Sequence, residues 1–520
     1  MLGFVVLCSV YEYGRVLHMR PLPHHLWRQT TCLSITQEYA EGGNSFFEPA
    51  VQSFIADDAT SGKTAAEFPI IYYVIGSLWK LIGRTEFAYR LIMLLLHAAG
   101  SWALFALTLR VLKDGALAVM VALFFFTVPT VVYFTLAFLP DVPALDFVLL
   151  GALALTRFME AGGFRNGTAT LFCFAMGGLL KITALMVPMA LFLALSAVLL
   201  VPAWRAKALF DLRRIPIVWG GLILVFLIVA AWTWYAVRYN HWNSASYSVM
   251  GTWALWDIGE ADRASALRFG RDILIYQIFD GPVWWALAGM LLVLIRYVRW
   301  IPVELVLFNA FLFGGTVLYV LLWTIALNNH DYYFIAPLVL PISLMLTFFW
   351  MVRERWPQAI TSRWTKATLF LLLVYHGAYA ATNHQMRTQA GRPVDAAALL
   401  PLYHDAELEH WRMTQYWAMA DLLDIVPLAR KVGVLPQDLV ITVPDESVCS
   451  ALYLIEQHGF NEFGGVRMDS ATVADRVRRG AKYLYLLGND TAVTTPLEGW
   501  LDRRILAHGE VGIYDLRRSP

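Results

Sequence analysis

Long apolar runs dominate the first 384 residues, and each is close to the length that an α-helix needs to cross a lipid bilayer. A spanning helix takes about 20 apolar residues. Lipid offers no hydrogen-bond partners, so such runs must be helices that satisfy their own backbone. We therefore predict a polytopic α-helical membrane protein with about 11 spans. The candidate spans are residues 1–17, 88–112, 115–136, 143–160, 166–182, 183–201, 216–237, 282–299, 302–326, 333–352 and 367–384.

Composition supports this class and excludes others. Only 15% of the 520 residues are charged, whereas soluble domains carry about 25%. The net charge of +1 provides no basic field, so we expect no nucleic-acid partner. The four cysteines are scattered without a CxxC pair, which excludes a cysteine-based zinc or redox motif.

Basic residues set the predicted orientation, because lysine and arginine favour the cytoplasmic side of a membrane. Segment 67–83 is apolar, but it is short and holds Pro69 and Lys80. If it lies in the outer interface instead of spanning, five basic clusters share one side. We therefore predict a bacterial inner (plasma) membrane protein with a cytoplasmic N-terminus. The clusters are Arg110/Lys113, Arg157/Arg165, Arg205–Arg214, Arg296/Arg299 and Arg353–Lys366.

Two domains are expected. Residues 1–384 form the transmembrane domain, with a first outward loop at 18–87 that is rich in histidine, carboxylate and aromatic residues. Residues 385–520 read as a small soluble α/β domain outside the cytoplasm. Within it we predict strands at 438–444, 481–488 and 511–516, a helix that stops at Gly459, and a second helix capped by Asp469 or Ser470. The domain carries no nucleotide-binding or hydrolase motif, which favours a structural or docking role.

An ordered set of motifs resembles the C-type membrane glycosyltransferases, of the family 39-like branch related to aminoarabinose transferase and protein O-mannosyltransferases. The resemblance spans roughly residues 20–350 and continues more weakly to the C-terminus. The motifs are HHLWRQTTCLSITQEYAEGG (24–43), EFPIIYYVIGSLWKLIGRTEFAYRL (67–91), FLPDVPALDFVLLGALAL (138–155), LLKITALMVP (179–188) and NNHDYYFIAPLVLP (328–341).

This resemblance implies a C-type glycosyltransferase fold and an enzyme that moves a sugar from a polyprenyl-phosphate donor in the membrane. It implies transfer on the outer face, to a lipid, glycan or protein acceptor, with a loop carboxylate as general base. Some branches use a divalent cation. No tight ligand cluster stands out in the sequence, so the need for a metal stays open.

Transfer needs a base for the acceptor hydroxyl and positive charge for the departing phosphate. Our candidates for the base are Glu67, His24, His25 and Asp141. Relatives carry an aspartate at the position of Thr31, so the expected acid is absent and the choice stays open. Each candidate also has a structural explanation: the histidines as a solvated loop pair, and the acids as helix-terminal charges or caps.

Lys181 is the first candidate for the phosphate, because it interrupts an apolar run and the resemblance places a lysine there. The planar fork of Arg28 suits an oxyanion, and Arg90 begins a span from the same side. The segment that opens span 333–352 can bind sugar hydroxyls or a metal; its residues are His330, Asp331 and Tyr332. The structural alternatives are a snorkelling lysine, a helix anchor and an aromatic belt.

Two other functions remain open. A lipid or glycan transporter would place ionisable residues at mid-membrane and show internal repeats, whereas the ionisable residues here lie mostly at helix ends and no repeat is evident. The missing aspartate at Thr31 also allows a catalytically inactive scaffold that keeps the binding groove.

Overall fold

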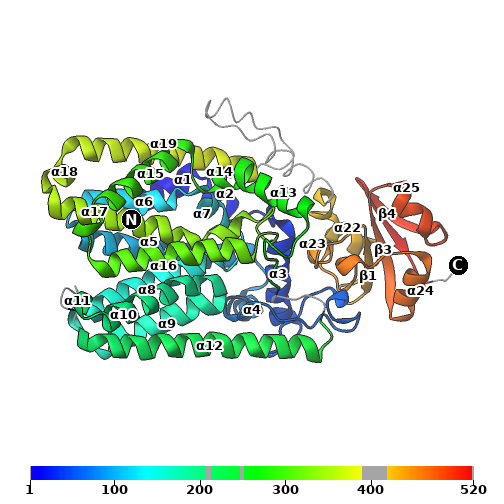
Figure 1. Cartoon of the computed structure of the whole chain (residues 1–520). Coiled ribbons are helices and arrows are strands. Elements are labelled where there is room, and N and C mark those ends of the chain that lie inside the picture. The colour runs from blue at the N-terminus through cyan, green and yellow to red at the C-terminus, as the bar shows by residue number, and fades with distance from the viewer. Residues whose placement is uncertain (1, 206–211, 246–250, 389–418, 518–520) are drawn as a thin grey trace.

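The computed structural model describes residues 2–205, 212–245, 251–388 and 419–517. Long helices run side by side in a bundle, and α3 (Leu26–Glu41) crosses one end of it (Figure 1). A β-sheet with short helices stands beyond α3 at that end. The first polar loop of the chain thus forms the layer between the bundle and the sheet.

Six helical segments in the described ranges are long and apolar enough to cross a membrane. A seventh results if Glu260–Ile278 and Gly281–Arg296, which meet at 88°, count as one broken span. The predicted class is confirmed, whereas the predicted 11 spans are not. The six segments are Glu86–Leu112, Asp141–Ala161, Ile182–Leu200, Ile215–Trp242, Val303–Leu322 and Asp331–Arg355.

Several predicted spans are shorter or broken. Predicted span 115–136 divides after Phe126 and restarts at Pro129, because proline has no amide hydrogen and keeps the residue before it extended. Predicted span 1–17 divides after Val10. The bundle helices are α1 (Leu2–Val10), α2 (Tyr13–Val16), α5 (Glu86–Leu112), α6 (Gly115–Phe126), α7 (Pro129–Phe134), α8 (Asp141–Ala161), α9 (Phe164–Leu180), α10 (Met186–Leu200), α12 (Ile215–Trp242), α13 (Glu260–Phe269), α14 (Ile275–Ile278), α15 (Gly281–Arg296), α16 (Val303–Leu322), α17 (Val339–Arg355), α18 (Pro357–Thr361) and α19 (Arg363–Thr388).

The basic clusters meet at one end of the bundle, as the orientation argument requires. Lys366 lies 2.6 Å from Asp114, and Arg353 donates to the carbonyl of Val111. Further contacts extend this end: Arg110 pairs with Glu160, Arg214 donates to the carbonyl of Phe158, and Arg355 lies over the ring of Trp300. Which side of the membrane this end faces stays a prediction.

The carboxylate of Asp146, inside predicted span 143–160, is paired. Its Oδ1 lies 2.9 Å from Nδ1 of His97 on the neighbouring helix α5. A Cβ at Gly100 would stand 2.1 Å from the same oxygen. The glycine lets α5 and α8 approach closely enough for the pair to form, so Asp146 belongs to the bundle core.

Helix α4 (Ile70–Ile82) confirms the helix expected at 67–83, and its 13 residues are too few to span. It packs against α3 at Gly76, where an added Cβ would stand 2.7 Å from the carbonyl of Thr36 and 2.8 Å from Cβ of Tyr39. The two helices therefore cross with their backbones nearly in contact.

The C-terminal residues form a five-stranded sheet of order β2-β1-β3-β5-β4. Strand β1 is parallel to β2 and β3, while β5 is antiparallel to β3 and β4. The predicted strands are present as β1, β3 and β5, and the second predicted helix is present with Asp469 as its N-cap. The elements are α22 (Ile425–Lys431), β1 (Leu439–Val443), α23 (Ser450–Ile455), β2 (Gly459–Phe460), α24 (Ser470–Arg478), β3 (Ala481–Leu487), α25 (Thr491–Thr494), β4 (Arg504–His508) and β5 (Val511–Asp515).

The prediction for Gly459 is wrong. Helix α23 ends at Ile455 with Glu456 in the left-handed conformation, and Gly459 lies in β2. There its amide donates to the carbonyl of Gln52, in the first polar loop. A Cβ at Gly459 would stand 1.9 Å from the carbonyl oxygen of Val440, so a close strand pairing requires this glycine.

Helix α23 joins the sheet to the bundle. All six of its residues are buried, and Oγ of Ser450 lies 2.9 Å from Oγ1 of Thr30 on α3. Helix α23 is therefore enclosed on all sides. Helix α19 continues to Thr388, four residues past the last predicted span. The boundary at 384/385 stays a prediction, since residues 389–418 lie outside the described residues.

Replacing Gly76 with alanine should destabilise the protein by about 1–3 kcal/mol, because the new methyl group meets backbone that cannot move aside. Thermal unfolding in detergent, followed by tryptophan fluorescence, measures the effect. Gly220→Ala is the control, since nothing lies within 4 Å of a Cβ there. Equal midpoints for the two variants would contradict the close crossing of α3 and α4.

Candidate functional site

Four charged side chains from separate parts of the chain form a continuous ionic cluster. Arg28 pairs with Oε1 of Glu67. Lys181 Nζ lies 4.0 Å from the same oxygen and 3.0 Å from Oδ1 of Asp141. The four side chains are between 3% and 12% exposed. Two cations and two carboxylates therefore neutralise each other where little water reaches them.

Helix ends place these groups. Arg28 lies in the first turn of α3, and Asp141 is the first residue of α8. Lys181 has an extended backbone conformation and lies between α9 and the 3₁₀ turn Ile182–Leu185. The amide of Phe68 donates to the carbonyl of Leu179, which fixes Glu67 beside that break. The site thus forms where several helices begin or end.

Each carboxylate of the ionic cluster uses only one of its oxygens in these ion pairs. Oε2 of Glu67 and Oδ2 of Asp141 are buried and have no hydrogen-bond partner within the described ranges. Buried polar atoms in native proteins normally have a partner, either in the protein or in water. These two oxygens are therefore available to a ligand or to water.

Burial and neighbouring charges shift the pKa values of this cluster in opposite directions. Burial alone would raise the pKa of Glu67, but Arg28 and Lys181 outweigh it and the pKa lies below its ordinary value. Burial would likewise lower the pKa of Lys181, and Asp141 outweighs it, so that the pKa is raised. Both groups therefore stay charged at neutral pH.

A second cluster surrounds Asp331. Its Oδ1 lies 3.1 Å from Nε2 of His25 and 3.6 Å from Nε2 of His24. Its Oδ2 accepts a 2.7 Å hydrogen bond from Arg387, near the end of α19. Arg387 also donates to Gln277. Burial lowers the pKa of both histidines, so the imidazoles are neutral at neutral pH and Arg387 balances the carboxylate.

The backbone is in an unfavourable conformation on both sides of this cluster. His25 has a φ of 56° and Asn329, two residues before Asp331, has a φ of 62°. Few residues other than glycine adopt the left-handed region, and such residues concentrate at functional sites. Packing around the cluster must hold this conformation in place.

Tyrosines connect the two clusters. Lys181 Nζ lies 4.6 Å from the ring centre of Tyr333 and 5.5 Å from that of Tyr332. The Tyr332 ring in turn stands edge-on to His25, at 4.9 Å, and His330 stacks on His25 at 5.6 Å. Burial lowers the pKa of His330 to about 4.

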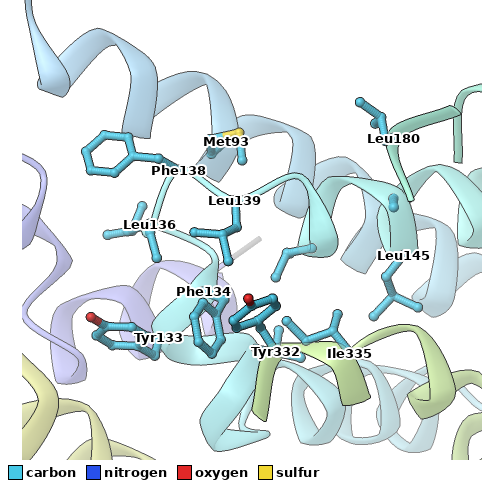
Figure 2. Close-up of a cluster of buried hydrophobic side chains, with 14 of the residues drawn as sticks. Met93, Tyr133, Phe134, Leu136, Phe138, Leu139, Leu145, Leu180, Tyr332 and Ile335 are labelled. Atoms are coloured by element: carbon cyan, nitrogen blue, oxygen red, sulfur yellow. The ribbon is translucent and has the colours of Figure 1, made fainter. Parts of the chain in front are cut away.

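Apolar side chains form the floor beneath His25. Figure 2 shows Phe134, Leu139 and Ile335 gathered around Tyr332. The Phe134 ring lies 5.5 Å from Tyr332 and 5.7 Å from His25. These apolar side chains keep water away from His25, which strengthens its electrostatic interaction with Asp331.

The atoms of His24, His25 and Asp331 are spaced closely enough to hold a metal ion, within 4.8 Å of one another. The charge is unfavourable, however. Arg387 already neutralises Asp331 and both imidazoles are neutral, so a divalent cation would leave a large positive charge in a buried position. The charges of this cluster therefore do not suit a divalent cation.

Two residues from the sequence prediction lie elsewhere. Arg90 is fully buried, and its guanidinium donates to the backbone carbonyls of Met19, Arg20 and Leu136. It holds three chain segments together, so we do not carry it into the proposed site. Thr31, where an aspartate was expected, donates to the carbonyl of Trp27 and contacts the thiol of Cys449. That position contacts the C-terminal residues.

Arg387 was missed, and the contact between Tyr333 and Lys181 was not predicted. Arg387 lies 56 residues beyond Asp331, in a part of the sequence that we had assigned to the C-terminal domain. A lone arginine just after an apolar run is the only sequence signal for it. Tyr333 adjoins the predicted HDY segment, and only the fold brings it to Lys181.

Comparison with known proteins gives a family match and a fold match. Residues 65–235 match the family model described as dolichyl-phosphate-mannose-protein mannosyltransferase. Searching curated proteins by sequence gives no significant match.

Among solved structures, ArnT from Cupriavidus metallidurans in the apo state is similar at 13% identity with a TM-score of 0.60, covering 99% of this chain and 97% of that one. The same protein bound to undecaprenyl phosphate gives 14% identity and a TM-score of 0.60, with the same coverage. Arabinofuranosyltransferase AftD from Mycobacteria gives 14% and 0.53, covering 99% of this chain and 40% of AftD.

Replacing Asp331 with asparagine should cost about 3–5 kcal/mol of unfolding free energy, because Arg387 would then be a buried charge without its counter-ion. The double variant Asp331→Asn/Arg387→Gln should recover part of this loss. Thermal unfolding in detergent gives both values. Asp475→Asn is the control, since its ion pairs with Arg478 and Arg479 are exposed and contribute little. The single variants Asp331→Asn and Arg387→Gln each lose some unfolding free energy. If the loss in the double variant equalled the sum of these two losses, the pairing would be refuted.

Proposed function

We propose that this chain, which has the fold of the C-type membrane glycosyltransferases, transfers a sugar from a polyprenyl-phosphate donor to an acceptor hydroxyl. One observation carries the proposal. Arg28 and Lys181 both pair with Glu67, and Lys181 faces the ring of Tyr332. That ring in turn contacts His25, whose imidazole is oriented by the buried Asp331. These are the two requirements of the chemistry: a site for the phosphate and a base for the acceptor.

Arg28 and Lys181 bind the donor's phosphate. In the structure both are paired with carboxylates, Glu67 and Asp141, which hold them in position without a ligand. A phosphate oxygen competes well for a guanidinium fork and for an ammonium group. Support for a polyprenyl donor comes from the similar structure that binds undecaprenyl phosphate.

His25 is the general base. Glu67 is held by two cations, which keep its pKa low and make it a weak proton acceptor. His25 is neutral, and its Nε2 faces Asp331 at 3.1 Å. A carboxylate that orients an imidazole and stabilises its protonated form is a recurrent catalytic arrangement. Asp331 is accordingly a positioning residue, and His24 supports the same carboxylate.

The reaction follows from these roles. The acceptor oxygen attacks the anomeric carbon of the sugar, while its proton passes to His25. The bond between that carbon and the phosphate oxygen breaks, and the phosphate keeps the electron pair. Arg28 and Lys181 stabilise the added negative charge, which is greatest at the transition state and in the product.

The remaining assignments follow the topology. The site lies at the end of the bundle that carries α3, opposite the basic clusters. By the positive-inside rule, this end faces away from the cytoplasm, in an inner membrane, and the acceptor is a lipid, glycan or protein there. The sheet behind α3 supports that helix and takes no part in the chemistry.

The position of Thr31 bears on the alternative of an inactive scaffold. An aspartate at 31 would lie against Cys449, among the C-terminal residues. Its absence is therefore compatible with an active site built on His25.

The variant His25→Gln should lower kcat by about 10²–10⁴, the contribution of a general base, with little change in KM for the donor. The assay is transfer of radiolabelled sugar from a polyprenyl-phosphate donor in proteoliposomes. Glu67→Gln is the comparison and should mainly raise KM, because it releases Arg28 and Lys181 from their fixed positions. Loss of turnover in Glu67→Gln with full activity in His25→Gln would reverse the assignment.

Acidity should inhibit the enzyme through His25. Because burial lowers the pKa of His25 below 6.5, the neutral form predominates at about pH 7. The profile of kcat/KM against pH should therefore be flat near neutrality and fall on acidification. Residual activity of His25→Gln should lack this acid limb. A limb that persists in the variant would point to another base.

The double variant Lys181→Gln/Asp141→Asn removes one charge of each sign, so the cluster stays neutral. It should bind polyprenyl phosphate at least tenfold more weakly, following the value of a charge-assisted contact. Native mass spectrometry of the purified protein with added lipid measures binding without requiring turnover. Unchanged binding would exclude Lys181 from the phosphate site.

A further inference from the structure

A cavity lies within the bundle, away from the proposed site. It has a volume of about 360 Å³ and is bounded by α15, α16 and α17. Pockets that bind small molecules measure about 300–1,000 Å³. Nearly all of its lining is aliphatic or aromatic, so its occupant must be apolar over most of its length.

The cavity opens to the outside of the bundle. Three of its lining residues are exposed although they are large and apolar: Ile295 (62%), Phe313 (58%) and Val298 (42%). In a membrane-spanning bundle such a surface faces hydrocarbon chains. An occupant can therefore enter sideways from the bilayer.

Its inner wall carries one polar pair. Asn309 donates to Oγ1 of Thr347 at 3.0 Å, and both residues line the cavity. Oδ1 of Asn309 is buried without a partner in the described part of the chain. The pair links α16 to α17 and keeps the two helices in register beside the cavity.

Aromatic and basic side chains adjoin the cavity at the end that carries the basic clusters. Trp300 lies 4.4 Å from Tyr297 and 5.5 Å from Trp356, measured between ring centres. Arg355 lies 4.9 Å from the centre of Trp300, and Arg296 lies 5.3 Å from that of Tyr297. Arg296, Tyr297 and Trp300 lie in the segment 295–301. Ile295, Val298 and Ile301 of the same segment line the cavity.

The charge of this rim is positive. Arg296, Arg299 and Arg355 are exposed there. The nearby acids are Glu354, whose carboxylate pairs with Arg353, and Glu304, which is buried. Tryptophan and tyrosine rings favour the level of lipid headgroups, and arginines there attract anionic lipids.

We propose that this cavity is a binding site for an anionic glycerophospholipid, with an acyl chain in the cavity and the phosphate at Arg296, Arg299 and Arg355. The arrangement combines an apolar slot open to the bilayer with a cationic, aromatic rim at headgroup level. The lipid fills a space that would otherwise weaken the contacts among α15, α16 and α17. The site is independent of sugar transfer.

The test is native mass spectrometry of the delipidated full-length protein, titrated with phosphatidylglycerol or with phosphatidylcholine of the same acyl chains. The wild type should bind one phosphatidylglycerol in preference to phosphatidylcholine. Arg299→Gln/Arg355→Gln should weaken that binding roughly tenfold or more. Lys113→Gln/Arg165→Gln removes two exposed charges of other basic clusters and should leave it unchanged.

A second variant addresses the cavity itself. Ala310→Trp places a large ring in the opening, so it should abolish the preferred site while the rim arginines remain. Equal binding of the two lipids by the wild type would overturn the proposal, as would retention of phosphatidylglycerol by a folded Ala310→Trp protein. Co-purification of a polyprenyl phosphate that only Ala310→Trp displaces would also overturn it, because the cavity would then hold the donor's tail.

Discussion

Charge neutralisation around Lys181 is the constraint on which the functional end of this protein depends. An ammonium group buried without partners would lose its proton or unfold its surroundings. Glu67 and Asp141 prevent this, and Arg28 balances the second carboxylate. Each of the four residues comes from a different helix end, so the cluster also fixes how α3, α4, α8 and α9 meet. The same charges that stabilise the fold are those that a phosphate can displace.

The cluster around Asp331 follows the same principle with a different outcome. Arg387 supplies the counter-charge, and the histidines are left neutral by burial. An oriented neutral imidazole accepts a proton more readily than a carboxylate bound by two cations. In the proposed function the two clusters have separate roles, one binding an anion and the other receiving a proton.

Much of this could be read from the sequence, and the rest could not for identifiable reasons. Length and hydropathy located the six long apolar helices, and charge placement predicted that the segment of α4 does not cross the membrane. The resemblance pointed to Lys181, and side-chain chemistry pointed to Arg28, Glu67 and Asp141. The pairing of such side chains was inaccessible. His25 and Asp331, for example, are 306 residues apart, and only the fold joins them. Strand β2 has two residues, too few to give a periodic pattern, so Gly459 was assigned to a helix end.

The burial of α23 against α3 has a consequence for how the protein is made. Thr30 is synthesised 420 residues before its partner Ser450. Until the last part of the chain arrives, the side of α3 that packs against α23 is uncovered. The layer between the bundle and the sheet is therefore completed only after nearly the whole chain has been made and the sheet has formed. An incomplete chain would hold the bundle in the membrane with the sheet-facing side of α3 exposed, so the order of synthesis decides when this helix is enclosed.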